Sequence, residues 1–278
     1  MIPYFQSPVL ELPLGQKIDL FGVLSAAGVM LGAWLGARAA KHYAPGDDEP
    51  LRGVVPWTVS FGLVGGHFLH LFAYHPELIR PDPWGILRVW DGLSSMGGVL
   101  GALLGIFVYF RREKIVLTPY LDAFALGTAP GWMVARIGCF VVHDHPGVLT
   151  DSPLAVNFPP RTFGLGDFGG PRYDLGLFDV FVLGAISVVL YLAARKRPKQ
   201  GRLMALLALL YAPCRFFLDF LRASDLGFVD RRYLGLTPAQ YIVVGLFITG
   251  IWLWRRAEEP SLTPSNSSSK ARAPQTGA

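Results

Sequence analysis

Cysteine and charge are both scarce in this chain. Only two of its 278 residues are cysteines and 16% are charged, whereas soluble domains carry about a quarter charged residues. Cys139 and Cys214 both fall in apolar stretches, which excludes a disulfide framework and favours buried free thiols. We find no internal repeat. The shortage of charge, with a hydrophobic content of 52%, predicts a membrane protein.

Seven apolar stretches are long enough, or nearly so, to cross a hydrocarbon core as helices of about 20 residues. They lie near 18–40, 55–75, 92–110, 118–142, 174–194, 203–222 and 238–254. The first is too long for a cleaved secretory signal, and its positive charges follow the apolar run instead of preceding it. We therefore expect an all-α fold in which residues 1–256 form one domain of seven transmembrane helices. Residues 257–278 are expected to form a disordered tail.

Lysine and arginine are concentrated in alternate loops. The segments after the first, third, fifth and seventh predicted helices are basic, whereas the loop at 77–83 and the loop at 225–232 mix both signs. The positive-inside rule places the basic loops in the cytoplasm. We therefore expect the N-terminus and the long loop at 143–173, which is rich in glycine and proline, to lie outside. The C-terminus is expected in the cytoplasm.

Ionisable residues inside these helices are functional candidates because burying charge in a membrane is costly. At about 1.5 Å per residue, Arg136 lies roughly 27 Å from the inner end of its helix and Arg215 roughly 18 Å. Asp219 follows Arg215 by one turn. Other polar residues of the outer half are Asp179, His67, His70, Asp91, Ser94 and Ser95. Their common level predicts one polar cavity that opens to the outer side.

Two arginines at the depth of lipid headgroups suit a phosphate, because guanidinium offers a planar fork of donors and stays charged. A carboxylate or histidine beside them could move a proton. Two simpler interpretations remain open. Arg215 and Asp219, at i and i+4, would neutralise each other on one helix face. Arg136 could reach lipid phosphates from the interface by itself.

Four stretches stand out: DLFGVLSAAGVMLGAWLGARAA at 19–40, RVWDGLSSMGGVLGALLG at 88–105, ARIGCFVVHDHPG at 135–147 and CRFFLDFLRASD at 214–225. With them, the chain resembles the bacterial prolipoprotein diacylglyceryl transferase family over about residues 5–256. The resemblance implies a multi-pass protein of the bacterial inner membrane. It also implies transfer of diacylglyceryl from phosphatidylglycerol to the lipobox cysteine thiol of lipoprotein precursors, at the outer face, with glycerol phosphate leaving. We expect no metal, no cofactor and no nucleic-acid partner.

The resemblance also implies where substrate binds. Arg136 matches the arginine of the family signature and Arg215 that of the sixth helix, and both positions are linked in the family to phosphatidylglycerol. The other matched positions expected to bind substrate are Gly138, Asp219 and Arg222. Asp144 stands where the signature has a glutamate.

The third-helix motif of the family contains a histidine, and Met96 stands at that position here. Another residue of this chain therefore has to accept the proton. Thiolate is the competent nucleophile, so a nearby base would help. The turn formed by His143, Asp144 and His145 is the expected catalytic group, and we expect one histidine to act and the other to be dispensable. Further departures from the family are Phe21 for a tyrosine and Cys139 for an asparagine.

Two alternatives stay open at this point. His143 and His145 could join His67 and His70, which are spaced i and i+3 on one helix, in a metal site. The retained arginines would also fit a diverged relative that binds phospholipid or a lipoprotein precursor without transfer.

Overall fold

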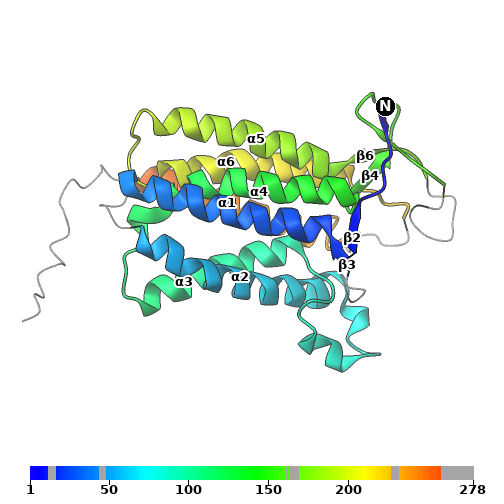
Figure 1. The fold of residues 1–278 in the computed structure, drawn as a ribbon, viewed down its shortest axis with the longest axis horizontal. Helices are drawn as coiled ribbons and strands as arrows, with labels where there is room; N and C mark the ends of the chain where they lie inside the picture. The colour runs from blue at the N-terminus through cyan, green and yellow to red at the C-terminus, as the bar shows by residue number, and fades with distance from the viewer. Residues whose placement is uncertain (12–16, 44–47, 161, 163–168, 227–231, 258–278) are drawn as a thin grey trace, which may run out of the picture.

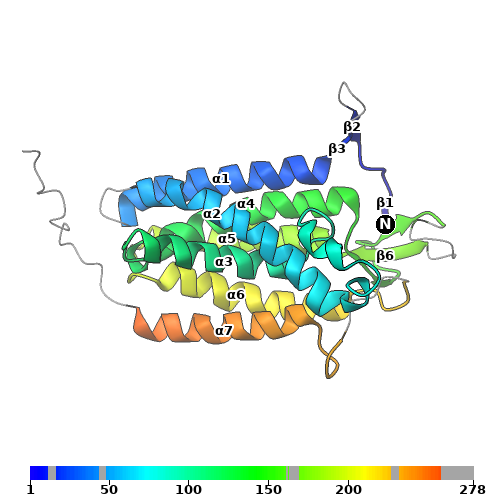
Figure 2. The ribbon, with the colours of Figure 1, turned by 90° about the horizontal axis from the view of Figure 1, so that it is seen from below.

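A computed structural model describes residues 1–11, 17–43, 48–160, 162, 169–226 and 232–257. The predicted tail lies outside these residues except for Ala257, and so does part of the loop at 143–173. Helices dominate the described chain and run nearly along its longest axis (Figure 1). Figure 2 shows α1 and α7 on opposite edges of the bundle.

An α-helix is present in each of the seven stretches predicted to be helical. In chain order these are α1 (Leu20–Tyr43), α2 (Glu49–Leu69), α3 (Ser95–Arg112), α4 (Leu121–Val142), α5 (Leu175–Ala194), α6 (Arg202–Leu218) and α7 (Pro238–Arg256). Shorter helical segments are the π-helix η1 (His70–Tyr74) and the 3₁₀ segments η2 (Pro76–Leu78), η3 (Pro83–Leu87), η4 (Thr118–Tyr120) and η5 (Asp219–Leu221). In the described part of the chain, five segments are long and apolar enough to cross a membrane. They are α1, α2 with η1, η4 with α4, α5, and α6 with η5.

Small sheets at one end of the bundle correct the all-α prediction. Strands β1 (Ile2–Pro3), β5 (Val156–Phe158), β6 (Gly170–Asp174) and β4 (Pro146–Leu149) form a sheet in that spatial order. Strands β2 (Val9–Glu11) and β3 (Lys17–Asp19) form an antiparallel pair. The loop at 143–173 thus folds partly as a sheet between α4 and α5. Its glycines and prolines obscure the alternation that marks strands.

Glycines set the closest helix contacts. A Cβ added at Gly131 of α4 would lie 2.5 Å from the carbonyl oxygen of Gly28 in α1. The same holds for α2 and α3, where a Cβ at Gly65 would lie 2.6 Å from the carbonyl oxygen of Gly97. Helices in membranes associate through such small-residue faces because lipid provides no hydrophobic drive between them. The α1–α4 pair therefore holds α4, and with it Arg136, against α1.

A carboxylate on α4 anchors the start of α6. Asp122 is fully buried, and its Oδ1 accepts hydrogen bonds from the backbone N–H groups of Leu203 (2.8 Å) and Met204 (3.2 Å). Its Oδ2 accepts from the N–H of Gly201 at 2.9 Å. The first turn of a helix leaves these N–H groups without a partner inside the helix. Asp122, although it lies on α4, therefore caps the N-terminus of α6.

Candidate active site

The last turn of α4 and the residues that follow it form the centre of the site. Arg136 and Cys139 lie one turn apart, and His143 ends the helix in the left-handed conformation at φ 55°. Histidine is among the residues that adopt this conformation more often than most. The chain then reverses, so that Nη1 of Arg136 donates to Nε2 of His145 at 3.1 Å.

Arg136 is buried, with 1% of its surface exposed, and it meets an acidic residue from the next helix. Its Nε lies 3.2 Å from Oδ2 of Asp179 in α5, and its Nη1 lies 3.5 Å from the Cys139 sulfur. The guanidinium carbon lies 5.9 Å from the centre of the Trp132 ring. Its Nη2 makes no hydrogen bond to the residues that the structure describes. Nε and Nη1 of the guanidinium are thus paired, and among the described residues its Nη2 has no hydrogen-bond acceptor.

Arg215 lies on α6 and is also buried. Its Nη2 is 3.0 Å from Oδ1 of Asp219, at i+4, and it lies within electrostatic range of Asp179 and Arg136. Its Nε has no hydrogen-bond partner within the described chain. Oδ2 of Asp219 accepts a hydrogen bond from the Thr237 hydroxyl, which caps α7. The structure therefore brings the two predicted arginines together across two carboxylates.

Arg222 adds a third positive group beside this pair. Its Nε lies 3.9 Å from Oδ1 of Asp219, and it lies within electrostatic range of Arg215 and Arg136. Tyr74, in the π-helix η1, is within electrostatic range of Arg222. π-Helical turns occur often at functional sites. The site thus gathers groups from η1, α4, α5, α6 and η5.

His145 and Asp144 form a pair next to Arg136. Nδ1 of His145 donates to Oδ1 of Asp144, because Nε2 is the acceptor for the Arg136 guanidinium. Burial lowers the pKa of the His145 imidazole below its ordinary value, although the neighbouring Asp144 carboxylate acts in the opposite direction. His145 is therefore neutral near pH 7 and has a lone pair directed at the arginine.

The contacts of two predicted site residues lie elsewhere. Nδ1 of His143 donates to Oδ2 of Asp174 at 2.7 Å, and its ring stacks on Tyr4 with 5.0 Å between centroids. Asp174 also caps α5 through the N–H of Gly176 at 3.0 Å. A Cβ on Gly138 would lie 3.3 Å from Phe21 of α1, so this glycine packs helices together. These contacts give His143 and Gly138 structural partners, and their expected catalytic and substrate-binding roles stay predictions.

The alternative metal site, in which His143 and His145 join His67 and His70, does not form among the described residues. The ring nitrogens of His67 bond the carbonyl oxygens of Gly85 (3.0 Å) and Gly92 (3.2 Å), and the ring of His70 lies 4.7 Å from that of His75. A different set does meet, because ligand atoms of Cys139, Asp144 and His145 lie within 4.8 Å of one another. The Arg136 guanidinium contacts two of these three residues, and its fixed positive charge opposes a cation there. The Arg136 charge therefore disfavours a metal ion at this cluster.

Four residues near the arginines were left out of the predicted site. Asp179 was noted only as an ionisable residue of the outer half, and Trp132, Tyr211 and Tyr74 were not considered. A signal for two of them exists in the sequence. Trp132 precedes Arg136 by four residues, and Tyr211 precedes Arg215 by four, so each pair shares a helix face. The rings of Trp132 and Tyr211 also contact each other, with 4.7 Å between centroids.

Comparison with known proteins identifies the family of this chain. A family model described as prolipoprotein diacylglyceryl transferase matches residues 8–256. The chain belongs to this family. Relatives named phosphatidylglycerol–prolipoprotein diacylglyceryl transferase include one from Chromohalobacter salexigens, 31% identical over 266 residues, which cover 93% of this chain and 96% of the relative. Another, from Nitratidesulfovibrio vulgaris, is 30% identical over 242 residues, covering 85% and 88%. One from Roseobacter denitrificans is 31% identical over 260 residues, covering 83% and 87%.

One position that departs from the transferase family's pattern is now explained by its surroundings. Met96, which replaces a histidine of the family's third-helix motif, is 2% exposed and packs in a cluster with Ala212, Ala239 and Val243. An uncharged, apolar side chain fits this contact between α3, α6 and α7.

Proposed function

We propose that this protein transfers the diacylglyceryl group of phosphatidylglycerol to the lipobox cysteine thiol of lipoprotein precursors. The observation that carries the proposal is the pair of buried arginines, Arg136 and Arg215. They come from different helices, and within the described residues each has one guanidinium nitrogen without a partner, Nη2 in Arg136 and Nε in Arg215. Family membership and the names of the relatives support the same reaction.

In the proposed reaction, Arg136 and Arg215 bind the lipid phosphate. The thiol sulfur attacks the glyceryl carbon that carries the phosphate ester, so a carbon–sulfur bond forms and the carbon–oxygen bond breaks. Glycerol phosphate leaves with the electron pair, and the arginines stabilise the charge that accumulates on its oxygen atoms. The acyl chains stay with the transferred group.

His145 is the proposed base for the thiol proton. It is neutral, only partly exposed and next to the phosphate-binding Arg136, and Asp144 fixes its tautomer through Nδ1. Its Nε2 would accept the proton when the thiol approaches. Asp144 would then stabilise the imidazolium, because an adjacent carboxylate favours the charged form. His143 is held by Asp174 and takes no part in this step.

A matched pair of variants tests this assignment. His145→Gln removes titration and should lower transfer by roughly 10²- to 10⁴-fold, the range of general base catalysis. His143→Gln should leave the turnover of folded protein near wild type and lower only thermal stability, because its role is to bond Asp174. Release of labelled glycerol phosphate in the presence of a lipobox peptide measures both. If His145→Gln retains full transfer, His145 is not the base.

Arginine geometry provides the test of phosphate binding. Lysine keeps the charge and loses the fork, so Arg136→Lys and Arg215→Lys should each weaken transfer by roughly 10- to 150-fold, the loss expected for a charge-assisted hydrogen bond. Arg88→Lys is the matched control, since Arg88 is half exposed and pairs with Asp82. Wild-type protein that binds phosphatidylglycerol yet releases no glycerol phosphate would refute transfer and leave the binding-only alternative.

We further propose that all seven helices cross the bacterial inner membrane, with the N-terminus and the candidate site at the outer face. The basic loops after α1, α3, α5 and α7 support this orientation. Cysteines introduced singly at Asp151 and Lys196, in a background without Cys139 and Cys214, test it. Asp151→Cys should react with an impermeant maleimide in intact cells and Lys196→Cys only after permeabilisation. The opposite pattern would invert the topology.

A further inference from the structure

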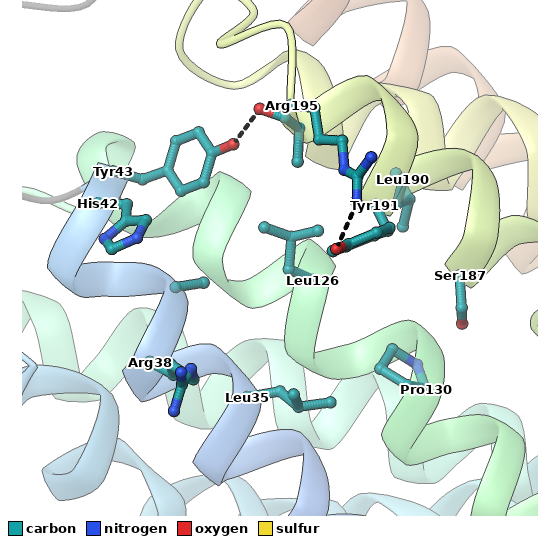
Figure 3. Close-up of a pocket in the computed structure, with 12 residues that line it drawn as sticks. Leu35, Arg38, His42, Tyr43, Leu126, Pro130, Ser187, Leu190, Tyr191 and Arg195 are labelled. Carbon is teal, nitrogen blue, oxygen red and sulfur yellow. Dashed lines mark hydrogen bonds between the residues drawn. The ribbon is translucent and has the colours of Figure 1, made fainter.

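A cavity lies at the end of the bundle opposite the candidate active site. Its volume is about 490 Å³, and it lies between α1, α4 and α5 (Figure 3). This volume is within the range of pockets that bind small molecules, about 300–1,000 Å³. Its walls come from the C-terminal halves of α1 and α5 and from Leu126 and Pro130 of α4. None of its lining residues belongs to the site around Arg136.

The walls of this pocket are apolar. Leu35 of α1, Leu126 of α4 and Leu190 of α5 line it, and Leu190 has no exposed surface. Figure 3 shows Leu35, Leu126 and Leu190 between the three helices, with charged side chains toward the helix ends. An apolar pocket between helices long enough to span a membrane suits a hydrocarbon chain.

The rim of the pocket is basic. Arg38, His42 and Arg195 line it and are exposed at the surface. Nη2 of Arg195 donates to the Tyr191 hydroxyl at 2.9 Å, which orients the guanidinium. None of the described residues that line the pocket is acidic, so these cations have no carboxylate partner within it. The rim therefore favours an anionic group.

One wall also carries a hydrogen-bond acceptor. Proline has no N–H, so Pro130 cannot donate to the carbonyl of Leu126 four residues earlier in α4. Both residues line the pocket. The Leu126 carbonyl therefore lacks the donor that an α-helix normally places four residues later.

We propose that this pocket binds an anionic phospholipid, with an acyl chain against the leucines and the phosphate between Arg38 and Arg195. The combination of apolar walls, a basic rim and the position at the end of membrane-length helices carries this inference. Arginine is the residue that best matches phosphate, and basic groups near a membrane surface attract anionic lipids. In the orientation proposed above, this lipid belongs to the cytoplasmic leaflet. Its binding is independent of transfer.

Photo-crosslinking locates the lipid without relying on activity. Leu35 is replaced by p-benzoylphenylalanine in the full-length protein, which is placed in nanodiscs of phosphatidylcholine with an increasing fraction of phosphatidylglycerol. We expect crosslinks mainly to phosphatidylglycerol. In the Arg38→Gln, Arg195→Gln double variant, half-maximal crosslinking should require roughly 30-fold more phosphatidylglycerol.

Two further variants keep this test falsifiable. Arg111→Gln with Arg255→Gln removes the same charge from exposed positions at the same end of the bundle, and it should leave crosslinking unchanged. Arg38→Lys with Arg195→Lys keeps the charge but loses the fork, so it should lose less crosslinking than the double glutamine variant, and the crosslinking that remains shows that the pocket is folded. Equal crosslinking to both lipids, or no difference between the two glutamine variants, would overturn the proposal. Crosslinks to a second protein chain would identify this face as a protein interface instead.

Discussion

The contact between α1 and α4 makes a prediction that joins packing to activity. Gly131→Ala places a Cβ 2.5 Å from the carbonyl oxygen of Gly28, whereas ordinary contacts begin at 3.4 Å. The helices must separate by about 0.9 Å, the difference between these values. Overpacking of this kind costs about 1–3 kcal/mol of stability. Because α4 also carries Arg136, five residues further on, a shift near 1 Å could lower transfer by about 10²-fold.

The control is a glycine of the partner helix that faces open space. A Cβ on Gly22 meets nothing within 4 Å, so Gly22→Ala should leave both stability and transfer near wild type. Thermal unfolding of the purified proteins in one detergent measures the first quantity, and glycerol phosphate release measures the second. Equal unfolding temperatures for Gly131→Ala and Gly22→Ala would refute the view that these glycines set the helix spacing.

Three other predictions concern polar groups. Asp122→Ala should destabilise the protein by about 1–3 kcal/mol in thermal unfolding, because three N–H groups at the start of α6, two of them buried, lose their acceptor. Glu113→Gln, at an exposed position of the same end, should have little effect. Because the pKa of His145 is lowered, transfer should be constant near pH 7 and fall as pH drops below about 6.5 and through that lowered pKa, and this decline should be absent from the residual activity of His145→Gln. The hydrogen bond from Arg172 lowers the pKa of Asp225. The stability that this pair contributes is therefore present above the ordinary pKa of aspartate and lost as pH falls through the lowered pKa. Since the Asp225 side chain is 46% exposed, Asp225→Asn should lower the free energy of unfolding by no more than about 1 kcal/mol at pH 7.

Helix positions could be predicted from the sequence because apolar runs long enough for a membrane are few and well separated. The pairing of Arg215 with Asp219 could be predicted too, since residues at i and i+4 face each other on any helix. That Arg136 and Arg215 lie in the same half of the membrane could be predicted from their distances to the inner ends of their helices, because the sequence indicates where both helices begin.

The roles of the two histidines could not be separated from the sequence. His143 and His145 are chemically alike, and what distinguishes them is the left-handed turn at His143 and the carboxylate of Asp174, 31 residues away. The role of Gly138 depends on the face of α1 that lies against it, which no local pattern reports. The strands were missed because β4, β5 and β6 are each only three to five residues long.

The carboxylates beside the arginines have a consequence for turnover. Asp179 and Asp219 act as built-in counterions, so the arginines remain neutralised within the membrane when no lipid is bound. Under the proposed function, an arriving phosphate replaces these carboxylates as the partner of the arginines. The free energy of phosphate binding is then only the difference between the free energies of the two ion pairings. Asp219 keeps its hydrogen bond from Thr237 during the exchange and is not left isolated. Such an exchange would hold the phosphate weakly enough for glycerol phosphate to leave, and the site would return to neutrality without waiting for another lipid.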